Sequence, residues 1–132
     1  MLFAPFFAAK EEATIINVTS GLAFTPLAIT PIYSATKAAL HSFTMCLRHQ
    51  LSNTPVEVIE VAPPAVNTDL GGVGLNIQGE PLDAFAVGIF KGLEEGQKEI
   101  GYGTSVGRLR MSRDEIDEYA EKLYAATKHI IE

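Results

Sequence analysis

Apolar residues change their spacing along this chain, and the changes predict alternating strands and helices. The segment TIINV, residues 14–18, is a continuous and largely β-branched run. Such a run is typical of a strand covered on both faces in a parallel sheet. Residues 33–51 repeat apolar side chains at helical spacing, and residues 56–62, VEVIEVA, alternate and are again β-branched. A strand, a helix and a strand in this order predict a parallel crossover unit.

Glycine and proline divide the second half of the chain into further elements. Residues 68–80 form a glycine-studded loop long enough to act as a lid over a site. A helix is expected over residues 81–96, because proline is favoured at a first helical position and glycine after a last one. Residues 99–103 predict a third, short strand. Ser112 and Glu115 form a capping-box pattern that begins a last helix. The apolar side of that helix is expected to consist of Ile116, Tyr119, Ala120, Leu123 and Thr127.

These elements predict one α/β domain over residues 1–132. Its expected architecture is a partial Rossmann-like, doubly wound parallel sheet of about three strands with flanking helices. Hydrophobic residues make up 47% of the chain and charged residues 20%, which is the composition of a globular protein. The net charge is -6 and the ten basic residues are scattered, so nucleic acid is not expected as a partner. The single cysteine, Cys46, is interpreted as a buried thiol on a helix, in a reducing compartment.

The beginning of the chain is apolar without resembling a secretion signal or a membrane span. Residues 1–10, MLFAPFFAAK, lack a basic first part, and Pro5 interrupts their short apolar run. No apolar run approaches the roughly twenty residues that cross a bilayer. The sequence therefore predicts a soluble, cytoplasmic protein with no membrane partner. Residues 3–10 are expected to be the end of a helix.

A serine, a tyrosine and a lysine after the first predicted strand are the strongest candidates for chemistry. Tyr33 and Lys37 are four apart on a helix, so their side chains share one face. This spacing alone is weak evidence, because it arises by chance in roughly 18% of chains of this composition. A second pair, Tyr124 and Lys128, has no strand-end serine before it and is interpreted as helix surface. Ser20 follows a strand directly, at the carboxyl edge where open parallel sheets bind ligands.

The order of these residues resembles the short-chain dehydrogenase/reductase family. The resemblance rests on Ser20, twelve intervening residues, the pair Tyr33 and Lys37, and PPAVNT, residues 63–68, after the next strand. It extends over most of the chain and is most similar to DltE-type members. It implies a Rossmann-like fold and an oxidoreductase that uses NADP or NAD to act on a small carbonyl or alcohol substrate.

The segment after the second strand resembles part of the family's cofactor site. The family's motif is a proline, a glycine, any residue, a valine or isoleucine, any residue and a threonine. Pro63, Val66 and Thr68 match this motif, whereas Pro64 replaces the glycine at which the backbone approaches the nicotinamide. By resemblance, the cofactor-binding residues are Tyr33, Lys37, Pro63, Val66 and Thr68.

The resemblance also implies catalytic roles for the first three candidates. Tyrosine ordinarily titrates at about pH 10, and a neighbouring ammonium favours its phenolate form. Lys37 would do this for Tyr33, which passes a proton to or from the substrate oxygen. Ser20 would hold that oxygen, and Lys37 would also bind the nicotinamide ribose. The structural alternative is that Ser20 caps a turn, Tyr33 opens a helix and Lys37 is solvated.

Other histidines and glycines carry weaker signals. His41, His49 and His129 have no metal-ligand spacing with one another or with the cysteine. They are interpreted as solvated or helix-packing side chains, and no metal is assigned. The glycines within residues 101–107 do not have the spacing of a phosphate loop, so a plain loop is expected until the helix at Ser112.

The resemblance covers only the C-terminal half of the family's fold. The family's glycine-rich turn, the charged residue after its second strand and its catalytic asparagine have no counterpart in these residues. We therefore expect a truncated or partial chain without the N-terminal dinucleotide-binding half, and no hydride transfer by this chain alone. Residues 14–18 would keep an open strand edge that a homo-oligomer or a complementing N-terminal half would cover.

Two other functions stay open. The first is a catalytically inactive dimerisation or interaction module, in which the helix over residues 33–51 pairs with a copy of itself. Its close approach would use small residues: Ser34, Ala35, Ala38, Ala39 and Ser42. The second is a sugar-nucleotide epimerase or dehydratase, which shares the tyrosine and lysine but usually has a larger C-terminal domain. The short C-terminus argues against the second.

Overall fold

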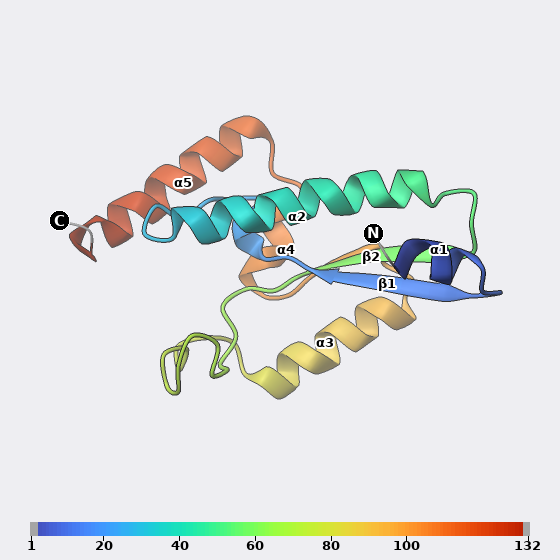
Figure 1. The fold of residues 1–132 in the computed structure, drawn as a ribbon. Coiled ribbons are helices and arrows are strands. Elements are labelled where there is room, and N and C mark those ends of the chain that lie inside the picture. Colours follow the sequence, from blue (N-terminus) through green and yellow to red (C-terminus); the bar gives the residue numbers. More distant parts are fainter. Residues whose placement is uncertain (1–2, 131–132) are drawn as a thin grey trace.

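Three parallel strands form one sheet in the computed structural model of the chain, which describes residues 3–130 (Figure 1). The strands β1 (Ala13–Val18), β2 (Val56–Ala62) and β3 (Glu99–Gly101) lie side by side in that order. The helix α2 (Pro31–Gln50) joins β1 to β2. The predicted parallel crossover and the α/β class are therefore confirmed.

Helices lie on both faces of this sheet (Figure 1). The helix α2 runs along one face, and α3 (Leu82–Glu94) runs along the other. The last long helix is α5 (Arg113–Thr127). The short elements are α1 (Phe3–Ala8), α4 (Thr104–Arg108) and the 3-10 helices η1 (Gly21–Ala23) and η2 (Lys128–Ile130). Within residues 3–130, every helix is too short or too polar to cross a membrane.

The start and the inward side of α5 agree with the sequence. The Ser112 hydroxyl oxygen accepts from the Glu115 backbone N–H at 3.4 Å, and the Glu115 carboxylate accepts from the Ser112 N–H at 2.7 Å. The Ser112 backbone N–H, and then its hydroxyl, hold the pKa of Glu115 below its usual value. The half-buried side consists of the residues predicted for it: Ile116, Tyr119, Ala120, Leu123 and Thr127.

The central strand β2 is buried on both faces because a helix packs on each. On the α2 side, Val56 and Val58 pack with Leu47 and Leu51. On the α3 side, the cluster consists of Ile59, Val61, Ile89 and Ile100. The strand predicted over residues 56–62 is confirmed, and Glu57 is its one exposed residue. The hydrophobic core therefore centres on β2.

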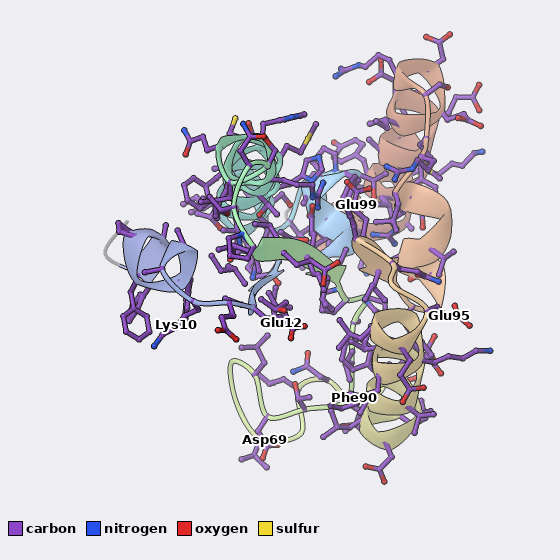
Figure 2. All side chains as sticks on the ribbon, turned by 90° about the vertical axis from the view of Figure 1, so that its right-hand side faces the viewer. Lys10, Glu12, Asp69, Phe90, Glu95 and Glu99 are labelled. Atoms are coloured by element: carbon purple, nitrogen blue, oxygen red, sulfur yellow. The ribbon has the colours of Figure 1, made fainter. Side chains whose placement is uncertain are left out.

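The strand β1 is less covered than its sequence predicts. Alternate residues are exposed, with Ile16 at 45% and Val18 at 52%. The helix α2 covers one face, but no element within residues 3–130 covers these side chains on the other. Figure 2 shows Phe90, also exposed, projecting from α3 on the side nearer Glu12. The prediction that β1 is covered on both faces is therefore wrong for the described residues.

Three further predictions are corrected by the structure. The helix α4 forms where a plain loop was expected, because the Ser105 hydroxyl ties its first turn to the carbonyl of Ala62 at 2.6 Å. Cys46 is exposed rather than buried, since α2 turns Thr44 and Leu47 inward instead. Ser34, proposed as part of an external small-residue face, is also buried, and its hydroxyl accepts from the Leu27 N–H.

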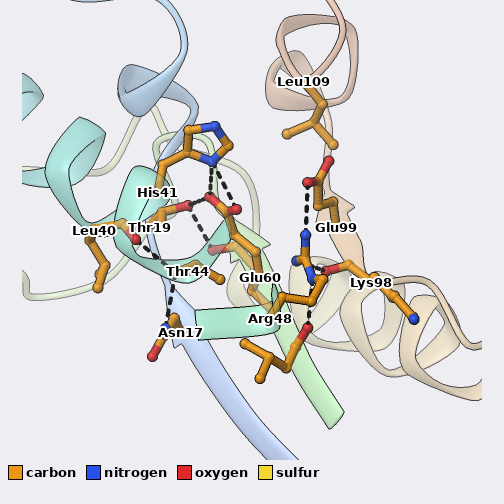
Figure 3. A network of polar contacts seen from close by, with 12 residues as sticks. Asn17, Thr19, Leu40, His41, Thr44, Arg48, Glu60, Lys98, Glu99 and Leu109 are labelled. Atoms are coloured by element: carbon orange, nitrogen blue, oxygen red, sulfur yellow. Dashed lines mark hydrogen bonds and ion pairs between the residues drawn. The ribbon is translucent and has the colours of Figure 1, made fainter. Parts of the chain in front are cut away.

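The Arg48 side chain joins α2 to two strands of the sheet. Its Nε donates to the Val58 carbonyl at 3.1 Å and its Nη2 to the Lys98 carbonyl, also at 3.1 Å. Its Nη1 pairs with Glu99 (Figure 3). Arg110 pairs with the other carboxylate oxygen of Glu99. The helix thereby contacts β2 and the start of β3 through one side chain.

We expect Ile100→Ala to lower the free energy of unfolding by about 2–5 kcal/mol, because Ile100 is 1% exposed and its removal leaves a cavity against α3. Urea unfolding at fixed protein concentration measures this change. Val87→Ala, on the exposed side of α3, is the matched control and should change the free energy by less than about 0.5 kcal/mol. Equal effects of the two substitutions would contradict the packing of β3 on α3.

Candidate active site

The ends of β1 and β2 lie together at the carboxyl edge of the sheet. The Thr19 N–H donates to the Val61 carbonyl at 2.8 Å, and the Gly21 N–H donates to the Pro63 carbonyl at 2.9 Å. Both strands therefore leave the sheet at the same place, as parallel strands joined by a crossover do. Ser20 lies between these two bonds. Ser20 therefore lies at the carboxyl edge of the sheet, where the sequence analysis expects it.

Ser20 is a turn cap as well as a candidate catalytic residue. It is buried, and its hydroxyl oxygen accepts from the Leu22 N–H at 3.1 Å at the start of η1. This is the structural role considered for it. A hydroxyl that accepts still has its own hydrogen to donate, and no acceptor for that hydrogen lies within residues 3–130. Capping and binding of a substrate oxygen are therefore compatible.

Tyr33 and Lys37 lie on the first turns of α2, on a shared face. The Lys37 Nζ donates to the Val18 carbonyl at 2.9 Å and is 5.6 Å from the centre of the Tyr33 ring. Tyr33 is 39% exposed. Lys37 is therefore not wholly solvated. It is held at the end of β1 by Val18, the residue two positions before Ser20.

Packing beside η1 fixes the start of α2. Phe24, directly after η1, contacts the His41 ring with centroids 4.4 Å apart, and the Leu27 N–H donates to the Ser34 hydroxyl at 3.2 Å. Pro31 at the first helical position presets the backbone there. The segment between Ser20 and α2 is thus anchored at several points.

The predicted cofactor residues after β2 separate into two groups. Pro63 lies against the Ser20 turn through its bond with Gly21. Val66 pairs with Glu80 at the base of the loop, and the Thr68 hydroxyl accepts from the Leu70 N–H at 3.4 Å. Within residues 3–130, no hydrogen bond joins Val66 or Thr68 to Ser20, Tyr33 or Lys37. The loop of residues 68–80 carries exposed apolar side chains: Leu70, Val73, Leu75 and Ile77.

A buried carboxylate behind this edge escaped sequence reasoning. Glu60 in β2 is 0% exposed, accepts from the Thr19 hydroxyl at 2.7 Å, and lies 2.9 and 3.0 Å from His41 Nδ1 (Figure 3). His41 is thus a hydrogen-bonding partner, not merely a solvated or packing residue. The available signal was a charged residue at a position of β2 where both neighbours, Ile59 and Val61, are apolar.

The site has no metal-binding arrangement and is an open edge. Among residues 3–130, no three His, Cys, Asp or Glu side chains are grouped to hold a metal ion. Two surface hollows lie elsewhere, one between α3, β3 and α4, the other beside the end of α2. Neither includes Ser20, Tyr33 or Lys37. The chemistry available at the edge is that of two hydroxyls and an ammonium.

A family model matches this part of the chain. The model, described as short chain dehydrogenase, covers residues 1–73, which include Ser20, Tyr33 and Lys37. The chain belongs to the short-chain dehydrogenase family. One similar member is the uncharacterized oxidoreductase DltE of Bacillus subtilis (strain 168), with 45% identity over 127 residues. The match covers 92% of this chain and 50% of that relative.

Solved short-chain dehydrogenases share the fold. A structure from Burkholderia cenocepacia J2315 in complex with NADP matches 94% of this chain and 52% of its own, with a TM-score of 0.74 and 24% identity. A structure from Sphingobium yanoikuyae in complex with NADPH matches 97% of this chain and 48% of its own, with a TM-score of 0.67 and 21% identity. This short-chain dehydrogenase chain therefore spans about half the length of the relatives it matches.

We expect Gly21→Ala to destabilise the Ser20 turn. A Cβ on Gly21 would lie 3.0 Å from the Ser105 Cβ and 3.3 Å from Arg108, so the turn or α4 must shift. The expected loss in free energy of unfolding is about 1–3 kcal/mol, measured by urea unfolding.

Gly107→Ala is the matched control, because its Cβ would meet nothing within 4 Å and the residue is helical. It should be neutral or stabilise by about 0.5–1 kcal/mol. If Gly21→Ala is as well tolerated as Gly107→Ala, the result would contradict the close packing of the Ser20 turn on α4.

Proposed function

We propose that this chain carries the proton-transfer side of an NADP- or NAD-dependent oxidoreductase that interconverts a small carbonyl compound and its alcohol. The observation that carries the proposal is the hydrogen bond from Lys37 Nζ to the Val18 carbonyl, at 2.9 Å. The bond holds Lys37 beside the strand end that bears Ser20, with the Tyr33 ring next to it. A lysine with only a solubilising role needs no such anchor.

Each of the three side chains has a distinct role in this proposal. The Tyr33 hydroxyl gives a proton to the substrate oxygen in reduction and takes one back in oxidation. Ser20 donates its hydroxyl hydrogen to the same oxygen and so orients it. Lys37 uses one of its N–H groups on Val18, and the others are available to the Tyr33 oxygen or to a ribose hydroxyl.

The donors at this edge fit the nicotinamide end of a dinucleotide. Hydroxyl and ammonium groups suit the ribose hydroxyls and the carboxamide, and Pro63 brings the backbone after β2 to the same place. Val66 and Thr68 would contribute from the base of the loop. The bound nicotinamide would exchange a hydride with the substrate carbon. The complexes of the Burkholderia and Sphingobium proteins with NADP and NADPH support such a cofactor.

The chain matches half of the Bacillus subtilis relative, and the family resemblance implies that the adenosine and pyrophosphate would need residues beyond these 132. Positioning of reactants accounts for roughly 7–11 kcal/mol of a barrier, so a loosely held cofactor supports little turnover. We therefore expect NADPH and NADH to bind the 132-residue chain more weakly than about 1 mM in calorimetric titration. Micromolar binding with turnover of small carbonyl compounds would contradict the need for a second segment.

Joining the chain to the part of the Bacillus subtilis relative that it does not match tests the catalytic assignment. In this fusion, NADPH oxidation with a panel of carbonyl compounds should fall at least about 100-fold in Tyr33→Phe. Tyr124→Phe is the control, because it removes the same hydroxyl from the other Tyr-x-x-x-Lys pair, on the exposed surface of α5. Full activity of Tyr33→Phe would rule out Tyr33 as the proton donor.

An interaction module is the second candidate, favoured by the exposed apolar side of β1. Ile16 and Val18 are about half exposed, and β1 pairs only with β2 within residues 3–130. Unpaired strand edges and exposed apolar patches are surfaces that proteins normally cover. A second copy of the chain or a complementing half would cover them.

We expect sedimentation at micromolar concentration to give species larger than the monomer. Ile16→Lys should shift the distribution toward the monomer, because it places a charge on the joining surface. Val87→Lys, which replaces an exposed residue of α3, should leave the distribution unchanged. A well-folded wild-type monomer would remove the case for a joining surface on β1.

A further inference from the structure

Glu60 is a fully buried carboxylate for which the proposed mechanism has no use. A buried carboxylate is unfavourable unless it is hydrogen-bonded and paired, and Glu60 is both. Thr19 donates its hydroxyl to Oε1, and His41 Nδ1 lies within hydrogen-bond distance of both carboxylate oxygens. Because a carboxylate only accepts, His41 presents its proton at Nδ1. The three side chains come from the end of β1, from β2 and from α2.

Thr19 connects the Glu60 carboxylate to the carboxyl edge of the sheet, where Ser20 lies. Thr19 stands between Val18, whose carbonyl accepts from Lys37, and Ser20, whose hydroxyl caps η1. Its N–H also donates to the Val61 carbonyl, so both its backbone and its side chain are tied to β2. Three consecutive residues at the end of β1 are therefore held by three different partners.

The helix α2 contacts the end of β1 directly through Lys37 and indirectly, by way of Glu60 in β2, through His41. Lys37 bonds the Val18 carbonyl, and His41, one turn later on the same face, bonds Glu60. Figure 3 shows His41 and Thr19 meeting at the Glu60 carboxylate. Loss of the Glu60 contacts would leave two side-chain ties of α2 here: the bond that Lys37 donates to the Val18 carbonyl, and the bond that the Asn17 amide donates to the Thr44 hydroxyl.

We propose that Glu60 is a positioning residue: through Thr19 it fixes the end of β1 that presents Ser20 and anchors Lys37, and His41 holds the carboxylate in place. The proposal rests on the proposed function for its catalytic meaning, whereas the positioning itself is a property of this chain. Glu60 and His41 do not touch the reacting atoms in this account. Their effect on catalysis passes through Thr19.

Amide hydrogen exchange of the 132-residue chain tests the positioning without any activity. Thr19→Val removes the hydroxyl and keeps the shape, and Glu60→Gln removes the charge. Either change should accelerate exchange at the Gly21 and Leu22 N–H groups about tenfold relative to the Ile59 N–H, which lies in the ladder between β1 and β2. Glu60→Gln can fail to fold, in which case Thr19→Val alone decides the outcome.

Two matched variants separate positioning from general stability. Thr19→Ser keeps the hydroxyl and should restore wild-type exchange at Gly21 and Leu22. Thr127→Val removes the hydroxyl of a half-buried threonine, which donates within α5 to the Leu123 carbonyl, and should leave exchange at Gly21 and Leu22 unchanged. Equal acceleration at Gly21, Leu22 and Ile59 in Thr19→Val, or no acceleration, would overturn the proposal.

The fusion assay shows whether the positioning matters for catalysis. Thr19→Val should lower kcat about tenfold with little change in KM for the cofactor, and Thr19→Ser should recover most of kcat. Absence of turnover in every fusion, with the exchange pattern as expected, would count against the proposed function and not against the positioning. Wild-type kcat in an active Thr19→Val fusion would overturn the catalytic part of the proposal.

Discussion

The site depends on the hydrogen bond between the Lys37 ammonium and the Val18 carbonyl. This bond joins the first half of α2 to the place where β1 leaves the sheet, and it sets the distance between Tyr33 and the strand end. Thr19 and Gly21 direct their N–H groups toward β2, so the carbonyl of Val18 between β1 and this turn faces the unpaired edge of β1 and is available to a side chain. The lysine satisfies that carbonyl and is itself held in place, which a flexible surface lysine is not.

The central strand supports this arrangement from behind. Because β2 is covered by helices on both faces, its backbone is a fixed reference for β1 and for the segment after Pro63. Polar contacts join β2 to α2 at two positions along the strand. The Glu60 carboxylate of β2 bonds His41, and the Arg48 guanidinium of α2 donates to the Val58 carbonyl. The same strand that forms most of the core thus also aligns the candidate site. A catalytic edge needs such support, since small displacements of reacting groups are costly.

Much of the fold, and the candidate residues, could be predicted from local sequence patterns. Features that depend on contacts between distant segments could not be predicted. The capping box at Ser112 and the crossover over residues 14–62 follow from spacing within one segment, and the structure has both. The coverage of β1 depends on elements far away in the sequence, and here one face stays open. The helix α4 depends on Ser105 bonding to the Ala62 carbonyl, which no local pattern encodes. The role of Glu60 depends on two partners from other elements, so its sequence position gave only the hint of a charge in an apolar strand.

The distance from Lys37 to the end of β1 is the most direct measure of this account. In an isotope-labelled sample of the chain, nuclear Overhauser effects from the Lys37 ε-methylene protons report its neighbours. The account predicts contacts to Val18 and Thr19, whereas Lys122, which is exposed on α5, should show none beyond its own turn. A Lys37 side chain without contacts to Val18 or Thr19, as mobile as that of Lys122, would contradict the proposed site.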